Sequence, residues 1–122
     1  WGTDLIPDDP FARAQMFQWL FWEQYNHEPA VAVLRFQRLY VKKAEAEIDP
    51  ALVAKSEGVL ALMEAHLASR DYFAGGGLSL ADIALVAYTR FAHEAALDLA
   101  RWPRVKAWVR RIEGDLALPH LI

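Results

Sequence analysis

The chain has 122 residues, of which 55% are hydrophobic, with five Trp, six Phe, no Cys and a formal net charge of −3 at pH 7. A chain of this length forms one domain and buries roughly two thirds of its unfolded surface, so its core needs no disulfide, and the lack of cysteine fits a reducing compartment and excludes a cysteine nucleophile. Acidic and basic residues are interspersed, and no apolar run approaches the ~20 residues that span a bilayer, so we expect neither nucleic-acid nor membrane binding.

The first segment of the chain has no helical periodicity. Residues 1–8 contain Pro7 and Asp8 and are expected to be the remnant of an interdomain linker, with residues 9–122 forming one helical domain. The segment lacks the basic and apolar regions of a signal peptide, so we expect a cytoplasmic location. Because the chain opens on Trp1 and not on methionine, we also expect a further segment to precede it.

Two long helices are predicted in the first half of the chain. Asp9 and Pro10 supply an N-cap and a proline at the first helical position, where its missing N–H costs nothing. The helices are expected over Phe11–Tyr25 and Pro29–Ile48, because the residue before a proline is pushed out of the α region.

A third helix is expected from Pro50, which follows a second Asp N-cap at Asp49, to about Ser69. Gly58 lies in its middle at a cost of ~1 kcal/mol relative to Ala. A glycine in that place indicates that another helix packs closely against it.

The strongest helix start in the chain is the run from Leu78 to Ile83, which follows three glycines. The Ser79 hydroxyl is predicted to accept from the Asp82 N–H while the Asp82 carboxylate accepts from the Ser79 N–H, which is a capping box. Leu78 and Ile83 are placed to close over this cap as a hydrophobic staple. The helix that follows, to about Ala95, is apolar on every side and is predicted to be a core helix. The cap explains the buried Asp82 carboxylate, so we assign it a structural role.

A last helix is expected from Pro103 to near Gly114. Its predicted inward-facing residues are Val105, Trp108, Val109 and Ile112. No window alternates apolar and polar residues with the period of two that a strand needs. The predicted fold is therefore all-α, a bundle of about five helices.

The aromatic run Trp19–Tyr25 has two possible interpretations, a ligand-binding site and core packing. Five residues share one helical sector by their i, i+3 and i+4 steps: Gln15, Trp19, Trp22, Glu23 and His27. Two indoles with polar groups suit one wall of a pocket for an amphipathic electrophile, whereas an aromatic stripe at this spacing is also typical of a core. The excess of aromatic residues further indicates that another domain or subunit covers part of one face.

No self-sufficient catalytic group is predicted. Glu23 in an aromatic setting either has a raised pKa and serves as an acid or base, or is a solvated or salt-bridged carboxylate. Glu23 and His27 have the i, i+4 spacing of a helical metal site, but one such pair supplies too few ligands, and we expect no metal. The serines lack the setting of a nucleophile, and Ser79 is used by the cap.

A basic cluster near the carboxyl end is the part of the sequence that most resembles a nucleic-acid-binding surface. Its members are Arg101, Arg104, Lys106, Arg110 and Arg111. The alternative, which we prefer, is the solvated face of the last helix, with charges that complement its carboxyl end.

The glycine loop, the Ser79–Asp82 box and the buried helix together resemble the C-terminal domain of the glutathione S-transferase superfamily. Gln18–Gln24 followed by His27–Pro29 is similar to the first long helix of bacterial members. Asp98-Leu99 and Trp102-Pro103, with Val105 and Trp108 after them, resemble the turn and final helix of the family. The matches cover nearly the whole chain in the family's order.

This resemblance implies a function for a longer parent protein. In the family, a thioredoxin-like domain precedes the helical one and carries the residue that activates the glutathione thiol, and no βαβ pattern is present here to house it. The resemblance therefore implies a parent that transfers glutathione to small hydrophobic electrophiles or reduces glutathione disulfides, and that forms a homodimer through its first two helices. The isolated chain is expected to supply the substrate-site wall and dimer contacts without turnover.

Two other hypotheses stay open. Similar helical domains are fused to translation elongation factors and aminoacyl-tRNA synthetases, where they mediate assembly without catalysis. A free-standing helical protein of unrelated role is the third hypothesis.

Overall fold

The computed structural model describes residues 3–122, and every regular element within that range is helical. The α-helices are α1 (Pro10–Trp22), α2 (Val33–Arg35), α3 (Pro50–His66), α4 (Leu80–Thr89) and α5 (Pro103–Asp115). Short 3₁₀ segments occupy Glu45–Glu47, Ala92–Ala95 and Leu99–Arg101. The all-α prediction is confirmed. No helix in the described part of the chain is long and apolar enough to cross a membrane.

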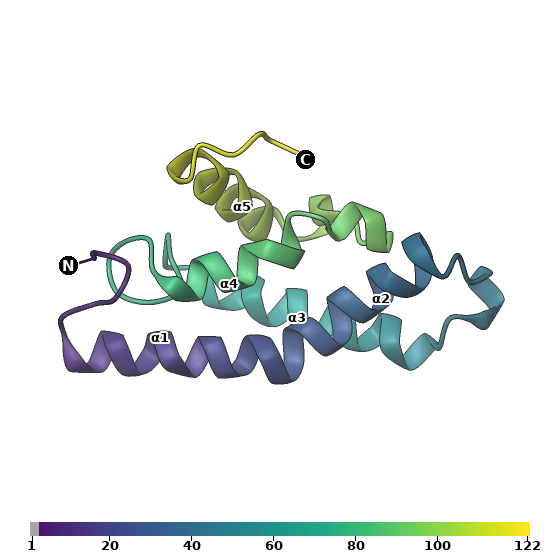
Figure 1. Ribbon diagram of the computed structural model, residues 1–122, viewed down its shortest axis with the longest axis horizontal. Helices are drawn as coiled ribbons and strands as arrows, with labels where there is room; N and C mark the ends of the chain where they lie inside the picture. The colour runs from purple at the N-terminus through teal and green to yellow at the C-terminus, as the bar shows by residue number, and fades with distance from the viewer. Residues whose placement is uncertain (1–2) are drawn as a thin grey trace.

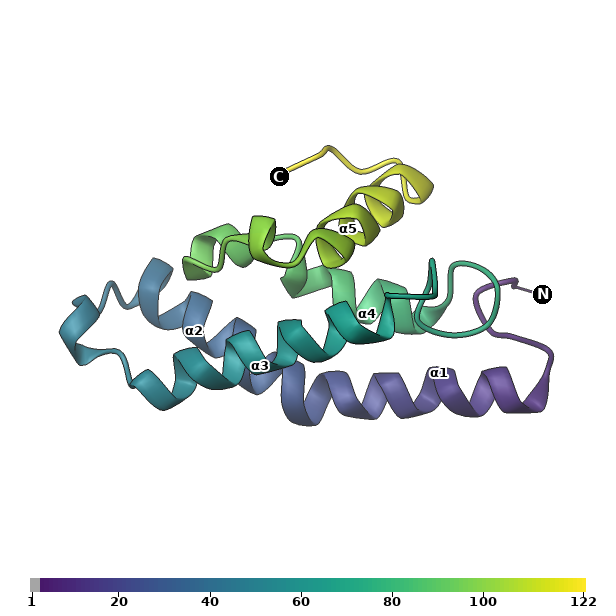
Figure 2. The same cartoon turned by 180° about the vertical axis from the view of Figure 1, so that it is seen from behind.

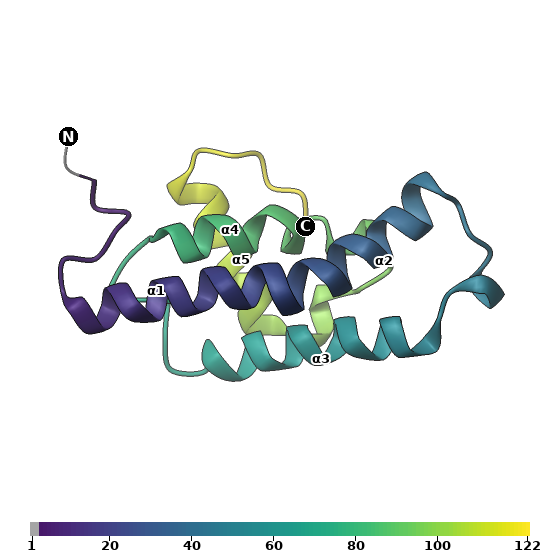
Figure 3. The same ribbon diagram turned by 60° about the horizontal axis from the view of Figure 1, so that its bottom comes forward.

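The helices form three layers. Figure 1 shows α1 and α2 as one long bent helix at one edge, α5 at the opposite edge, and α3 and α4 between them. The reverse view shows α3 running antiparallel to the long helix (Figure 2). In Figure 3 the long helix lies in front of both, with α4 on one side and α3 on the other. The core therefore sits where α3 and α4 meet the middle of the long helix.

The predicted break before Pro29 is wrong, because the chain stays helical from Pro10 to Tyr40. Glu23–Ala32 and Phe36–Tyr40 are π-helical, with wider turns than an α-helix. A wider turn relieves the clash that a proline ring makes with the preceding turn of an α-helix. Ala30 and Val31 beside the proline are fully buried, so packing against α3 and α4 outweighs the local preference of Pro29.

The long helix also ends earlier than predicted, at Tyr40 and not at Ile48. Lys42 has a left-handed backbone conformation with φ +56°, which stops the helix. Arg38 stabilises the loop that follows by donating to Glu45 at 2.5 Å and to the Ala95 carbonyl at 2.6 Å. Ile48 is buried and anchors the end of this loop in the core.

Both predicted Asp-Pro helix starts are confirmed. The Asp9 carboxylate accepts from the Ala12 N–H at 2.8 Å, and the Asp49 carboxylate accepts from the Ala51 N–H at 2.9 Å. Gly58 of α3, by contrast, is exposed, and a Cβ added there meets no atom within 4 Å. The predicted close packing at Gly58 is therefore wrong.

The Asp82 carboxylate is fully buried and accepts four hydrogen bonds from three segments of the chain. At the start of α4 it accepts from the Ser79 N–H and hydroxyl, both at 3.0 Å. The Phe73 N–H donates to it from the preceding loop at 3.0 Å, and the Trp108 indole N–H donates from α5 at 2.9 Å. Asp82 thus joins α4 to α5 and to the loop, which is more than the helix cap predicted from the sequence.

The other predictions for the core helix and the final helix agree with the structure only in part. The α-helix after Ser79 ends at Thr89, and Ala87 on it is exposed, so α4 is shorter and less completely buried than predicted. Leu78 packs against the core, while its staple contact with Ile83 stays a prediction. The four predicted inward residues of α5 are all fully buried, as expected.

The segment before α1 contacts the start of α4, because the Leu80 N–H donates to the Leu5 carbonyl at 3.0 Å. The Pro7 carbonyl accepts from the Arg13 guanidinium at 3.0 Å. Trp1 and Gly2 of the predicted linker lie outside the described residues. The division into a linker, residues 1–8, and a domain, residues 9–122, stays a prediction.

Gly58→Ala is expected to raise the free energy of unfolding by about 0.5–1 kcal/mol, because alanine restricts the unfolded chain and nothing opposes its methyl group. Thermal unfolding of the two proteins checks this. A lower midpoint for the alanine variant would contradict the exposed position of Gly58.

Asp82→Ala is expected to lower the free energy of unfolding by about 3 kcal/mol or more, because it leaves several buried donors unpaired. Asp98→Ala is the matched control: Asp98 caps an exposed turn by accepting from the Ala100 N–H at 2.9 Å, and its loss should cost about 1 kcal/mol. Urea unfolding measures both. Equal losses in the two variants would refute the central role of Asp82.

Candidate functional site

A groove between α1 and α3 brings together three of the five predicted wall residues, Gln15, Trp19 and Trp22. Its volume is about 340 Å³, and its other lining residues are Gln18, Leu62, His66 and Arg70. The α1 members recur at i, i+3, i+4 and i+7 and so share one side of the helix. The two indoles pack edge to face, with centroids 5.1 Å apart. Trp19 also contacts the rings of His66 and Phe73, at 4.6 and 4.8 Å, so its ring both lines the groove and packs in the core.

Glu23 and His27 do not line this groove, because both are buried on the core side of the helix. Glu23 follows the fully buried Met16 by seven residues, which is two helical turns, and therefore shares its direction. This seven-residue spacing is visible in the sequence and could have predicted that Glu23 faces the core. No such spacing predicts the α3 side of the groove, because Leu62 and His66 are separated from the α1 residues by about forty residues or more along the chain.

The buried His27 imidazole is hydrogen-bonded to α4. Its Nε2 lies 2.9 Å from the Thr89 hydroxyl, which itself donates to the Leu85 carbonyl at 2.7 Å. The hydroxyl proton is thereby used, so His27 donates through Nε2. His27 Nδ1 lies 3.8 Å from the Glu23 carboxylate and forms no hydrogen bond. His27 thus connects the π-helical segment to α4, and neither Glu23 nor His27 lines the groove.

The pKa of Glu23 is shifted in the direction opposite to the one that an acid or base at neutral pH needs. Burial raises the pKa of this carboxyl, but the neighbouring His27 imidazole and the Gln24 amide, which donates at 2.7 Å, outweigh it and hold the pKa below its usual range. Glu23 is therefore ionised at neutral pH. The direction of this shift is opposite to the raised-pKa alternative, and the carboxylate lies beside the His27 imidazole and the Gln24 amide.

His66 on the groove wall is neutral at pH 7. Its Nε2 lies 3.0 Å from the Phe73 carbonyl, so that nitrogen carries the proton. Burial lowers the pKa of His66, and the charge of Arg70 adds to this; the hydrogen bond to Phe73 and the charge of Asp82 act against it, and the net shift is downward.

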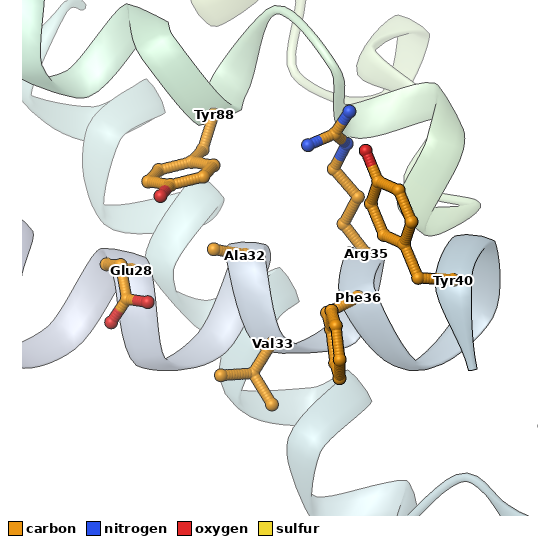
Figure 4. A pocket seen from close by; sticks show the side chains of 7 residues that line it. All are labelled: Glu28, Ala32, Val33, Arg35, Phe36, Tyr40 and Tyr88. Atoms are coloured by element: carbon orange, nitrogen blue, oxygen red, sulfur yellow. The ribbon is translucent and has the colours of Figure 1, made fainter.

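A second hollow, of about 330 Å³, lies further along the long helix and was not predicted (Figure 4). Its lining residues are Glu28, Ala32, Val33, Arg35, Phe36, Tyr40 and Tyr88. In Figure 4 Tyr88 projects from α4 toward the long helix, which supplies the other side chains. The Phe36 and Tyr40 rings are stacked with centroids 6.0 Å apart, and Arg35 is paired with Glu94 at 2.5 Å. The i, i+4 spacing of Phe36 and Tyr40 is the signal that sequence reasoning passed over.

Aromatic side chains are also exposed on α1 and the segment after it. Phe17, Phe21 and Tyr25 follow each other at intervals of four residues and are 46%, 73% and 82% exposed. We call these three residues the aromatic stripe. An exposed stripe of this kind is typical of a surface that another domain or subunit covers.

The basic cluster near the carboxyl end is largely neutralised by ion pairs. The pairs are Arg101 with Glu57 at 2.5 Å, Arg104 with Glu64 at 3.4 Å and Arg111 with Asp71 at 3.1 Å. Arg110 donates to the Ile122 carbonyl at 3.2 Å. These contacts support the solvated-face interpretation over a nucleic-acid footprint.

The groove can bind a ligand but supplies no nucleophile. Its lining consists of amides, indoles, one leucine, one imidazole and one guanidinium. Within residues 3–122, no three His, Asp or Glu side chains gather in a group that could hold a metal ion. The Ser79 hydroxyl is engaged with Asp82.

Known proteins match this chain along nearly its whole length. A family model described as Glutathione S-transferase, C-terminal domain, matches residues 30–111. The curated glutathione S-transferase 3 of Zea mays is 36% identical over 99% of the chain. A solved glutathione S-transferase from Pseudomonas fluorescens covers 99% of the chain with a TM-score of 0.90 and 37% identity, and one from Xanthobacter autotrophicus covers 98% with 0.86 and 42%.

These proteins are longer than this chain. It covers 57% of the Zea mays protein, 61% of the Pseudomonas fluorescens chain and 58% of the Xanthobacter autotrophicus chain. The chain spans about half the length of the curated relatives it matches.

His66→Gln is expected to flatten the pH dependence of stability between about pH 7.5 and 5.5. Because the pKa of folded His66 lies below that of the unfolded residue, about 6.5, the unfolded state binds more protons in this range and the wild-type chain loses stability as the pH falls. Urea unfolding across this range measures the difference. Parallel curves for the two proteins would contradict the shift.

Proposed function

The chain belongs to the glutathione S-transferase family, as its helical C-terminal domain, and from this we propose that the full-length protein transfers glutathione to electrophiles or reduces glutathione-linked disulfides in the cytoplasm. The match of nearly the whole chain to glutathione S-transferases, in sequence and in fold, carries the proposal. The chain itself serves as a substrate-site and dimerisation domain without turnover.

The proposed separation of thiol activation from substrate binding follows from the chemistry of the glutathione thiol. Glutathione reacts as a thiolate, which a nearby donor must stabilise. Neither the groove nor the second hollow is lined by a serine or a cysteine; the Tyr40 and Tyr88 side chains belong to an aromatic wall beside a paired arginine. The proposed activating residue, and the glutathione site, therefore belong to a thioredoxin-like domain that precedes residues 9–122, with residues 1–8 as the linker.

The wall of the hydrophobic substrate site is proposed at the groove, with Gln15, Trp19 and Trp22 as its α1 contribution. Indole faces and edges bind apolar rings, while the amide fixes orientation. Of the two other residues expected in this wall, His27 contributes from the core side by joining the helix to α4, and Glu23 lies beside its imidazole. The second hollow, with its exposed Phe36 and Tyr40 rings, is the competing place for the same substrate.

The aromatic stripe is proposed as part of a homodimer contact. Phe21 and Tyr25 point away from the core and lie on the first long helix, and a dimer that covers them removes apolar surface from water at about 25 cal/mol per Å². The same surface suits assembly with a different protein, which is the non-catalytic scaffold alternative.

Glutathione conjugation to 1-chloro-2,4-dinitrobenzene, together with reduction of a glutathione mixed disulfide, tests the enzymatic proposal. The full-length protein is expected to turn over at least one of these substrates, and the purified 122-residue chain neither. Saturable conjugation by the chain alone would show that it carries its own activating group. Inactivity of the full-length protein on both would favour the scaffold alternative.

The place of the substrate wall is tested by titrating the chain with S-hexylglutathione and with glutathione while tryptophan fluorescence is recorded. A response to the hexyl compound alone is expected, because its apolar tail reaches Trp19 and Trp22. Tyr40→Ala, in the second hollow, is the control and should leave this response unchanged. Loss of the response in Tyr40→Ala would indicate that the hexyl compound binds in the second hollow and not in the groove.

A further inference from the structure

Three arginines gather at one small hollow between the end of α3 and α5. The hollow has a volume of about 260 Å³, and we call it the arginine hollow; its lining residues are Leu67, Ala68, Arg70, Asp71, Arg104, Ala107 and Arg111. The α1–α3 groove and the second hollow each contain a single arginine. In a chain whose net charge is −3, this gathering is a local excess of positive charge.

Two of the three arginines have guanidinium donors to spare. Arg70 is exposed and forms no ion pair within residues 3–122. The acidic neighbour of Arg104 is Glu64, whose carboxylate accepts from the backbone N–H groups of Arg104 and Val105, each at 3.0 Å. The Arg104 guanidinium reaches that carboxylate only at 3.4 Å, and its side chain is 56% exposed. Because Glu64 caps α5 in this way, most of the five N–H donors of Arg104 stay available.

The third arginine, Arg111, is held in place by a backbone contact. It donates to the Asp71 carbonyl at 2.9 Å and lies 3.1 Å from the Asp71 carboxylate, the one carboxylate in the lining. The Asp71 side chain is 75% exposed, and an ion pair so open to water contributes little to stability. An anion of higher charge can therefore replace this carboxylate while the carbonyl still orients Arg111.

The size and lining of the arginine hollow favour a compact, highly charged ligand. Its volume is below the range of roughly 300–1,000 Å³ that is typical of small-molecule sites, and its lining contains no aromatic ring. The carboxyl end of α3 and the amino end of α5 have opposite partial charges, so the guanidinium groups decide the sign of the potential. Arg101, Lys106 and Arg110 do not line the hollow, which argues against a continuous track for a nucleic acid.

From this arrangement we infer that the arginine hollow binds the dianionic phosphate of a small phosphate monoester, through the guanidinium groups of Arg70, Arg104 and Arg111. A phosphate monoester has three terminal oxygens and close to two negative charges, so several guanidinium groups can bind it at once. Each guanidinium can donate two parallel hydrogen bonds to phosphate oxygens. The inference assigns binding and no reaction to the hollow, and it does not depend on the proposed transferase activity.

The test compares methyl phosphate, a dianion at about pH 8, with dimethyl phosphate, which has one negative charge. Each is titrated into the purified chain at constant ionic strength, and binding is followed by phosphorus NMR and by the thermal unfolding midpoint. Methyl phosphate is expected to bind at least about fivefold more tightly than dimethyl phosphate. Arg70→Gln and Arg104→Gln are each expected to weaken methyl phosphate about two- to fivefold, and the double variant about tenfold, as for exposed ion pairs.

Two matched variants serve as controls. Arg110→Gln removes an exposed arginine of α5 that does not line the hollow, and Leu62→Gln changes the α1–α3 groove alone. Both should leave the affinity for methyl phosphate unchanged. A loss in Arg110→Gln equal to that in Arg70→Gln would show attraction to the positive surface in general and would overturn the site, and a loss in Leu62→Gln would place binding in the groove.

Equal affinities for the two phosphates, or an unchanged affinity in the double variant, would overturn the dianion site. A phosphoserine peptide with glycines on both sides of the phosphoserine distinguishes the source of the phosphate. Binding of this peptide more than tenfold tighter than methyl phosphate would overturn the small-molecule assignment in favour of a phosphorylated protein. None of these outcomes bears on conjugation by the full-length protein, which the enzymatic assay decides.

Discussion

The fold depends on one buried carboxylate, that of Asp82, which accepts hydrogen bonds from the start of α4, from the loop before it and from the Trp108 indole of α5. A carboxylate that loses its water needs compensation for nearly every lone pair, and here four donors supply it. The donors come from segments that only the folded chain brings together. The same bonds therefore position α5 against α4 and direct the loop whose Phe73 ring and carbonyl contact Trp19 and His66 at the groove.

Tertiary packing also explains why strong local signals did not decide the helix boundaries. Pro29 is a helix breaker by its own geometry, yet the residues that follow it are buried between α3 and α4, and a π-helical segment retains them there. Lys42 carries no sequence signal for a helix end, yet its left-handed backbone ends the long helix. Burial of a whole segment outweighs the conformational preference of one residue. Each packing contact contributes little, but many contacts add together, whereas the helix propensity of one residue contributes a single term.

The candidate site combines an aromatic groove wall with a buried polar pair on the opposite side of the same helix. The groove has an aromatic wall, neutral amides and a single guanidinium, while the buried Glu23 and His27 do not line it. His27 joins the long helix to α4 through Thr89. Family membership alone does not assign a ligand, since function belongs to sites and not to folds. In this chain the charge and shape of the groove wall carry that information.

The sequence by itself determined the all-α class, the two Asp-Pro helix starts, the buried face of α5 and the family, because caps and the 3.6-residue period are local properties that a linear pattern records. It also placed Gln15, Trp19 and Trp22 on one side of α1. Only the tertiary structure decided that Glu23 and His27 turn to the core, that Gly58 is unpacked, that Trp108 and Phe73 donate to Asp82, and that Leu62, His66 and Arg70 complete the groove. Those relations join residues far apart in the chain, and their distances arise from packing of all the helices together, which no local pattern contains.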